Sequence, residues 1–432
     1  MKFVFITPWY GMFAGGLESE FRCYAEILTT LGHEVEVLTT CSQSPYHSWN
    51  IDFFKPGEEN IEGVKVLRFK TNKESRKKYL EAEEAAFKHP TLEQQYNFFN
   101  FGIASNDLVD YIATYPPEVI LIAGPYFQSL SYLAITRYPQ KIYLRTALHN
   151  EPQASWKPVQ EMLINAKGFL LSTEAEKDLI IFLHCNCLGR KIVEHPVIGV
   201  PFYPPAYDQH STFSAQPHES NPSELALPPK YFLYLGRKER GKGVDLLVTW
   251  YQRYIENCNQ EGREPIPLVF LGGGHVDLLP THNPNFIDLG YVDIGEKNKI
   301  LAKALGLINL SMYESFSLVL MEAWSLQVPV IVNAKCEVTK EHCYKSSGGI
   351  TVDSETSFCE ALKTLENIQI GRAMGFLGKQ YYLSNYRLSK VINNFFDLVS
   401  IPVGFQEAGE ARASSRSGAY IEYVSSERST QL

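Results

Sequence analysis

Two glutamates with seven residues between them stand in a stretch that otherwise has the composition of a protein core. They are Glu314 and Glu322 in YESFSLVLMEAWSLQVPVIV, residues 313–332. A carboxylate that leaves water without a partner loses much of its hydration free energy, so Glu322 needs compensation. Hydroxyl donors from a ligand would supply it, and so would an ordinary structural ion pair with a basic side chain.

The residues around these glutamates predict a strand, a loop and a helix. LINLS is typical of a strand, MYESF of a loop at its carboxyl end, and the helix is expected to begin near Ser317. Glu314 then lies in the loop and Glu322 about a turn and a half inside the helix. The unpaired amides of Phe316, Ser317 and Leu318 would form a helix N-terminus that suits a phosphate.

Two basic residues follow another predicted strand. In YLGRKERGKGVDLL, Gly236 and Arg237 end the strand and Lys242 stands five residues after Arg237, where a helix begins. Two fixed cations at a strand end can hold a diphosphate, and an arginine does so with two hydrogen bonds. The alternative is a polar loop with ordinary surface residues, as we expect for Lys238 and Arg240.

Glycines follow two more predicted strands. KFVFIT leads into a loop that ends with Gly15 and Gly16 before a helix, where backbone amides can approach an anion or a sugar closely. By itself such a pair is as often a simple turn. FLGGGH places Gly272 at the end of another strand, but it lacks the GxGxxG spacing of a dinucleotide site, so an NAD site is poorly supported.

Length and composition predict two domains in an aqueous, reducing compartment. The 432 residues suit two domains with a cleft between them, and the net charge of -8 provides no general field for nucleic acid or an anionic membrane. The eight cysteines have no framework spacing, which favours a cytoplasmic location. No apolar run is long enough to span a membrane. HCNC, residues 184–187, lacks the further ligands of a zinc site, so buried thiols are the preferred interpretation.

Near-continuous apolar strands alternate with helices through most of the chain, which indicates parallel sheets covered on both faces. We predict an α/β protein with two Rossmann-like, doubly wound parallel-sheet domains, in which ligands bind outside the carboxyl ends of the strands. The predicted parts are a first domain at 1–207, a linker at 208–229, a second domain at 230–385, a closing helix at 386–404 and a disordered or loosely attached tail at 405–432. The charged segment 70–88 is expected to be a solvated helix.

In these motifs the sequence resembles the retaining family 4 glycosyltransferases. The resemblance rests on Gly15 and Gly16, on GRKERGKG and on ESFSLVLME, in this order over some 310 residues. It implies the glycosyltransferase-B fold and transfer of a sugar from a nucleotide-diphosphate sugar to an acceptor hydroxyl with retained configuration and without metal. Beyond this donor substrate it implies no cofactor. The acceptor would be a saccharide, a lipid-linked molecule or a small molecule.

By this resemblance, Arg237 and Lys242 hold the donor diphosphate, Glu314 contacts the donor sugar and Glu322 binds the ribose. TALHNE resembles the histidine segment of the first domain, which makes His149 a candidate for contacting the transferred sugar. The substrate-binding set also includes the residues of the glycine turns and of the helix start: Gly15, Gly16, Gly236, Gly272, Ser315, Phe316, Ser317 and Leu318.

Two residues depart from the family pattern. Ser317 and Gln327 stand where the family usually has glycine. They leave open a catalytically silent relative that binds nucleotide sugar without transferring it. A nucleotide-sugar epimerase on the same fold is a further alternative. The donor sugar, its base, the acceptor, the oligomeric state and any peripheral contact with a membrane are not determined by the sequence.

Overall fold

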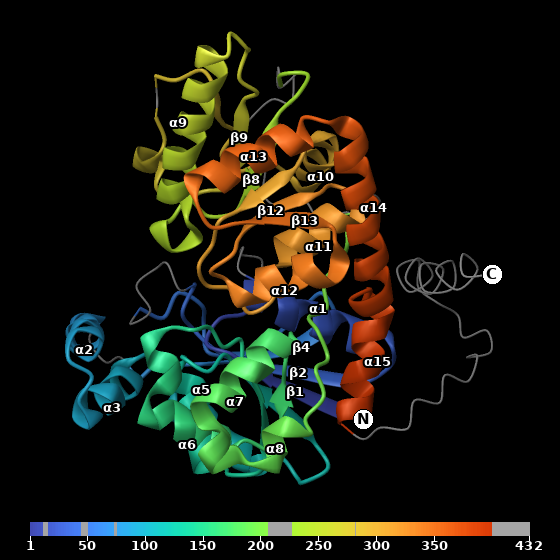
Figure 1. Cartoon of the computed structure of the whole chain (residues 1–432). Helices are drawn as coiled ribbons and strands as arrows, with labels where there is room; N and C mark the ends of the chain where they lie inside the picture. The colour runs from blue at the N-terminus through green and yellow to red at the C-terminus, as the bar shows by residue number, and fades with distance from the viewer. Residues whose placement is uncertain (12–15, 45–50, 73–75, 206–226, 281, 400–432) are drawn as a thin grey trace, which may run out of the picture. The chain divides into compact units, whose positions relative to one another are not determined.

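The computed structural model describes residues 1–11, 16–44, 51–72, 76–205, 227–280 and 282–399, and it divides into two compact units. Unit 1 comprises Met1–Phe202 and the chain from Val391 onward, and unit 2 comprises Tyr203–Lys390. Each unit contains one mostly parallel sheet, which packs against helices (Figure 1). The predicted tail, Gly15 and all but residues 227–229 of the predicted linker lie outside the described residues.

Unit 1 contains a seven-stranded sheet in the order β3-β4-β2-β1-β5-β6-β7, parallel except for the antiparallel pair β3 and β4. Every residue of β5 and β6 is buried, which explains why these strands are almost entirely apolar. The elements are β1 Lys2–Ile6, α1 Gly16–Thr30, β2 Glu34–Thr40, β3 Gly57–Ile61, β4 Val64–Phe69, α2 Arg76–Lys88, α3 Leu92–Phe101, α4 Asn106–Tyr111, β5 Ile120–Ala123, α5 Ser129–Arg137, β6 Ile142–Arg145, α6 Lys157–Asn165, β7 Phe169–Leu170, α7 Glu174–Leu188 and α8 Arg190–Val193.

Unit 2 contains a parallel six-stranded sheet in the order β10-β9-β8-β11-β12-β13. The strands β8 and β11, which carry the loops with the candidate site residues, are neighbours in this sheet. The elements are β8 Phe232–Leu235, α9 Val244–Gln260, β9 Leu268–Leu271, β10 Phe286–Asp288, α10 Ile294–Lys303, β11 Leu307–Asn309, α11 Leu318–Ser325, β12 Val330–Asn333, α12 Glu337–Ser346, β13 Gly349–Val352, α13 Glu355–Leu365 and α14 Ile368–Asn385. The prediction of two parallel-sheet domains is confirmed.

The chain returns to unit 1 through the predicted closing helix, α15, Leu388–Leu398. Its Phe395 and Phe396 rings lie 5.7 and 6.3 Å from the ring of Phe3 on β1, so the helix completes the apolar packing of unit 1. The segment predicted as a solvated helix contains α2, whose mixed charges face mostly outward.

Gln327 occupies the left-handed position that ends α11. Its φ is 60°, the Gln327 amide donates to the Trp324 carbonyl at 2.9 Å, and the Val328 amide donates to the Ala323 carbonyl at 2.9 Å. These two hydrogen bonds form a Schellman motif, in which glycine is favoured because it has no Cβ. Gly375 on α14 lies so close that a Cβ there would come within 1.9 Å of the Gln327 carbonyl oxygen. The close packing of α14 therefore fixes the end of α11, even though a glutamine is unfavourable at this left-handed position.

Replacing Gln327 by glycine should raise the free energy of unfolding by about 1 kcal/mol, because it removes the strain of a side chain at positive φ. Gln327→Ala is the matched control. It keeps the Cβ and the exposed side chain contributes little, so the alanine variant should have nearly the stability of the parent protein. Urea titrations of the three proteins measure the difference. A glycine variant that is less stable than the parent would contradict the account of this helix end.

Candidate active site

Glycines bring the ends of strands β8 and β9 together. Gly236 has φ 149° and Gly272 has φ 114°, and a Cβ on Gly272 would lie 2.3 Å from the Gly236 carbonyl oxygen. A side chain at Gly272 could not be accommodated without moving the backbone. The two loops at this edge of the sheet are therefore in direct backbone contact.

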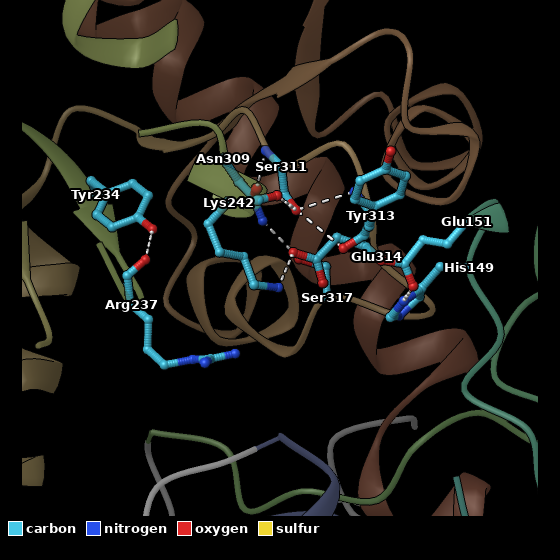
Figure 2. Close-up of polar contacts among 11 residues, drawn as sticks. His149, Glu151, Tyr234, Arg237, Lys242, Asn309, Ser311, Tyr313, Glu314 and Ser317 are labelled. Carbon is cyan, nitrogen blue, oxygen red and sulfur yellow. Dashed lines mark hydrogen bonds and ion pairs between the residues drawn. The ribbon is translucent and has the colours of Figure 1, made fainter. Parts of the chain in front are cut away.

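Lys242 and Glu314 meet across two neighbouring strands. The Lys242 ammonium donates to Glu314 Oε1 at 3.0 Å, and Figure 2 shows the lysine side chain reaching the loop that follows β11. Gly243, with φ 70°, makes this approach possible because a Cβ there would lie 2.3 Å from the Leu310 carbonyl oxygen. The Glu314 side chain is 12% exposed and that of Lys242 is 33% exposed. Two predicted site residues from distant parts of the sequence thus form one charged pair.

A short polar network shapes the loop between β11 and α11. Asn309 accepts a hydrogen bond from the Ser311 amide at 2.9 Å, and its Nδ2 donates to Ser317 Oγ at 3.0 Å (Figure 2). Ser311 Oγ donates to the Tyr313 carbonyl at 3.1 Å. These bonds hold the chain on both sides of Glu314.

Ser317 precedes α11 in a left-handed conformation, with φ 72° and ψ 78°. This conformation costs a residue with a Cβ about 1 to 2 kcal/mol, which gives a physical reason for the glycine that is usual at this position. The hydrogen bond from Asn309 to the serine hydroxyl offsets part of that cost. The helix begins at Leu318, one residue after the predicted start, and Phe316 is buried behind the loop.

Arg237 is held by its backbone as well as by its side chain. Its carbonyl accepts from the Tyr234 hydroxyl at 2.5 Å, and its guanidinium Nη1 lies 2.7 Å from Glu239 Oε1. Burial raises the pKa of Tyr234, and the negative charge of Glu314 adds to the increase, so the tyrosine remains a hydrogen-bond donor. Arg237 thus stands at the end of β8 as predicted, with its charge facing an acidic partner.

Lys238 is not the ordinary surface residue that the sequence suggested. Its side chain is 1% exposed and its ammonium lies 2.8 Å from Asp288 Oδ1 at the end of β10. It also donates to the Gly272 carbonyl. The prediction of a surface lysine was wrong because the loop packs against the glycine turn after β9. There the long side chain of Lys238 reaches both this turn and the end of β10. Lys238 thereby fixes the position of the turn that contains Gly272.

Glu322 forms an ion pair with Lys297 of α10. The lysine ammonium lies 2.9 Å from Glu322 Oε1, and the two side chains are 23% and 17% exposed for Lys297 and Glu322 respectively. Glu322 is therefore half-buried, and the structure contains the ion pair that was one of the two ways to compensate it. Among the described residues, Lys297 alone makes a hydrogen bond with the Glu322 carboxylate.

In unit 1, His149 lies in the loop after β6. Its Nδ1 is 3.2 Å from Glu151 Oε2 (Figure 2). Gln153 Nε2 donates to the same carboxylate oxygen at 2.9 Å. The loop itself is anchored by Glu176, whose Oε1 accepts from the Leu148 amide and whose Oε2 accepts from the Ser172 amide, each at 2.7 Å. Glu176 thus fixes the backbone next to His149.

A buried arginine supports the same region. Arg145 Nε donates to Glu20 Oε1 at 2.7 Å, and Glu176 Oε1 lies 3.7 Å from Arg145 Nη1. Burial raises the pKa of Glu20, while the Arg145 guanidinium opposes the shift. The cluster links the N-terminal part of α1 to the end of β6. Gly16 is the first residue of that helix.

The remaining polar groups give no metal site within the described ranges. No three His, Cys, Asp or Glu side chains gather there as metal ligands. His184 of HCNC is buried, with its Nε2 2.7 Å from the Ala154 carbonyl oxygen. The expectation of buried thiols in this motif was wrong, because His184 lies on the buried face of α7 while Cys185 is exposed and Cys187 is only partly buried. All eight cysteines are free thiols. Among the described helices, none combines the length and hydropathy needed to cross a membrane.

The chain has the glycosyltransferase-B fold of several solved structures. It is similar to the E. coli trehalose-6-phosphate structure bound with UDP-2-fluoro glucose, with a TM-score of 0.66, 11% identity, and coverage of 93% of this chain and 99% of that chain. It is also similar to sucrose-phosphate synthase from Thermosynechococcus elongatus (TM-score 0.61, 16% identity, 92% and 98% coverage). A third similar structure is trehalose-6-phosphate synthase in work on glycosyl transfer with retention (TM-score 0.65, 11% identity, 92% and 99% coverage). At these identities the similarity shows the fold alone.

Within the second unit, part of the sequence matches a known family. Residues 229–367 match the family model described as Glycosyl transferases group 1. This part of the chain is therefore a group 1 glycosyltransferase domain, and the resemblance to glycosyltransferases is confirmed. No curated protein matches the chain in sequence.

Several residues at the site were not predicted from the sequence. Lys297 pairs with Glu322, and Asn309 and Ser311 shape the Glu314 loop. Asn309 and Ser311 stand at the end of a predicted strand, which is a signal that could have marked them. Lys297 lies on α10 among other charged residues. Nothing in the sequence around it distinguishes it from them as a site residue.

Proposed function

We propose that the chain is a retaining glycosyltransferase that moves a sugar from a nucleotide-diphosphate sugar to an acceptor hydroxyl without a metal ion. The observation that carries the proposal is the pairing of Lys242 with Glu314 beside the start of α11, within the domain that matches the group 1 glycosyltransferases. The cations and the helix N-terminus are suited to a diphosphate, and the carboxylates are suited to sugar hydroxyls.

In the proposed reaction, the bond between the anomeric carbon and the diphosphate oxygen breaks while a bond to the acceptor oxygen forms on the same face. The nucleoside diphosphate leaves with the bonding electron pair, and the leaving diphosphate takes up the proton that the acceptor hydroxyl gives up. Negative charge grows on the leaving group, where Lys242, Arg237 and the amides at the start of α11 would stabilise it. Glu314 would hold the sugar near its reacting face, and Lys242 would pass from its carboxylate toward the phosphates as the donor binds.

The roles of the other predicted residues follow from the same scheme. Gly236 and Gly272 would let the backbone approach the nucleotide, and Glu322 would accept hydrogen bonds from the ribose hydroxyls through Oε2. Gly16 and His149 of unit 1 would contact the transferred sugar. We propose a cytoplasmic location, in keeping with the eight free thiols.

The proposal is tested first by thermal melting with uridine, guanosine and adenosine diphosphates and their sugars. A ligand present at a hundredfold over its dissociation constant that binds only the native state should add about 2.7 kcal/mol of stability. Binding with slow release of nucleoside diphosphate, and faster release with an acceptor, is expected of a transferase. Binding with no release would instead show a catalytically silent relative. Solvent isotope incorporation into the sugar without any acceptor would show an epimerase.

Glu322→Gln should weaken donor binding by roughly 1 to 3 kcal/mol, because it removes a charged acceptor for the ribose hydroxyls. The stability of the free protein should change by less than about 1 kcal/mol, since the ion pair with Lys297 is partly exposed to solvent. Calorimetric titration with the nucleoside diphosphate measures the first effect and urea unfolding measures the second.

Lys297→Met is the matched control for this experiment. It breaks the same ion pair but leaves the Glu322 carboxylate in place, so it should keep the nucleotide affinity of the parent protein to within a few fold. If Glu322→Gln and Lys297→Met both lower stability and neither changes affinity, then Glu322 is a structural residue and the ribose assignment is wrong.

A further inference from the structure

A buried histidine contacts the backbone of the candidate donor loop. His342 of α12 is 1% exposed, and its Nε2 lies 3.1 Å from the Phe316 carbonyl oxygen. Its Nδ1 lies 3.0 Å from the Tyr381 hydroxyl on α14, and the hydroxyls of Tyr381 and Tyr386 are 3.4 Å apart. His342 therefore stands between α14 and the loop that carries Glu314.

The partners of His342 determine where its proton lies. A carbonyl oxygen can only accept, so Nε2 carries the proton and donates to Phe316. Nδ1 is then the acceptor for the Tyr381 hydroxyl. The ring is enclosed by Phe316 at 5.6 Å and Trp324 at 6.2 Å between centroids, both in edge contact. Such packing leaves the imidazole a single orientation.

The hydrogen bond to Phe316 also determines the direction of the next amide. In a trans peptide the C=O and the N–H point in opposite directions, so a fixed Phe316 carbonyl fixes the Ser317 N–H. Rotation of this peptide by half a turn would move Ser317 from φ 72° to a negative φ, where a serine is not strained. The observed orientation is therefore the strained one, and His342 is the group that holds its carbonyl.

We propose that His342 is a positioning residue for the donor diphosphate, which holds the Phe316–Ser317 peptide so that the Ser317 amide faces the phosphate instead of the protein interior. This inference deepens the proposed function and rests on it. His342 itself lies behind the loop and touches no substrate. Its burial lowers its pKa to about 3, so the ring stays neutral at neutral pH and its unprotonated Nδ1 can accept from the Tyr381 hydroxyl.

Two substitutions separate the roles of the two ring nitrogens. In His342→Gln the side-chain amide can occupy the place of Nε2 and donate to Phe316, whereas the shorter side chain of His342→Asn reaches only as far as Nδ1. Both variants should melt lower than the parent by similar amounts. The probes are the nucleoside diphosphate that the parent protein binds, among UDP, GDP and ADP, and the corresponding nucleoside.

The expected result is a loss of diphosphate affinity in the asparagine variant alone. His342→Asn should bind the diphosphate roughly tenfold or more weakly and bind the nucleoside as the parent does, because only the amide directed at phosphate is misplaced. His342→Gln should stay within about threefold of the parent for both ligands. Equal losses in the two variants, or a parallel loss of nucleoside affinity, would overturn the proposal.

A control and a ligand-free measurement complete the test. His184→Asn removes a buried Nε2 contact with the Ala154 carbonyl in unit 1, and it should lower stability without changing nucleotide affinity. Crystal structures should show the Phe316–Ser317 peptide unchanged in His342→Gln and rotated in His342→Asn. An unrotated peptide in the asparagine variant would refute the inference even if the parent protein bound no nucleotide, an outcome that would separately refute the proposed function.

Discussion

Lys242→Ala should lower turnover of the nucleotide sugar by roughly 100- to 1000-fold, the usual effect of removing one preorganised group that stabilises transition-state charge. The affinity for the donor in its ground state should fall by a much smaller factor. The reason is that Lys242 starts out paired with Glu314, so transferring it to the diphosphate gains most when the leaving group has acquired its full charge. Steady-state kinetics and calorimetric titration of the same preparation separate the two effects.

Lys340→Ala is the matched control for this prediction. Lys340 lies on α12 of the same unit, and its ion pair with Glu337 is exposed at the surface. Its removal should leave turnover and donor affinity unchanged. If Lys242→Ala retained turnover within threefold of the parent enzyme, the lysine would have no part in stabilising the leaving diphosphate.

Acid should destabilise unit 2 through His342. The pKa of this histidine is about 3 in the folded protein, because burial opposes the charged form, against 6.5 for an accessible histidine. Between these values the unfolded chain binds a proton that the folded protein does not, so stability decreases as the pH falls. Once the pH is well below 6.5, this group alone should lower the free energy of unfolding by up to about 1.4 kcal/mol per pH unit.

The measurement is urea unfolding of the parent protein and of His342→Gln at pH 7, 6 and 5. The groups that face His342 are Tyr381, Tyr386 and Lys345, and the positive charge of Lys345 adds to the lowering of the histidine pKa. The glutamine variant should lose the steeper part of the pH dependence. Equal pH slopes in the two proteins would mean that His342 is protonated in the folded state or is open to solvent.

The sheets were largely predictable because their central strands are nearly all apolar. Two strands, β3 and β13, could not be predicted from the sequence, each for a different reason. β3 is a polar strand at the sheet edge, with residues such as Glu58 and Glu59 exposed, so it shows no core-facing pattern. β13 is four residues long and begins with a glycine, which leaves too little sequence for a periodic signal.

The helix α14 could not be predicted from hydrophobic periodicity because of the way it packs. Its buried face carries Gly371, Gly375 and Gly378 instead of an apolar stripe. A Cβ on Gly378 would lie 2.1 Å from the Trp324 ring, so the glycines serve the close approach of α11. Hydrophobic periodicity identifies helices that present large side chains, and this helix presents none at those positions.

The sequence singled out individual candidate residues, but it did not predict which of them form ion pairs with one another. Arg237, Lys242 and Glu314 were recognisable because charged residues directly follow apolar strands. That Lys242 meets Glu314 depends on β8 and β11 being neighbours, which strand order in the sequence does not reveal. The ion pair of Glu322 with Lys297 likewise depends on how α10 and α11 pack. The catalytic and substrate-binding roles of all these residues, of His149 and of the glycines stay predictions.

Calorimetric titration of the parent protein with UDP, GDP and ADP in the presence of EDTA tests the central claim most directly. If the second unit is a metal-independent donor site, at least one of these nucleotides should bind at one site per chain, and Glu322→Gln should weaken that binding by roughly 1 to 3 kcal/mol. A folded parent protein that binds none of the three, or binds one only when a divalent metal is restored, would contradict the account.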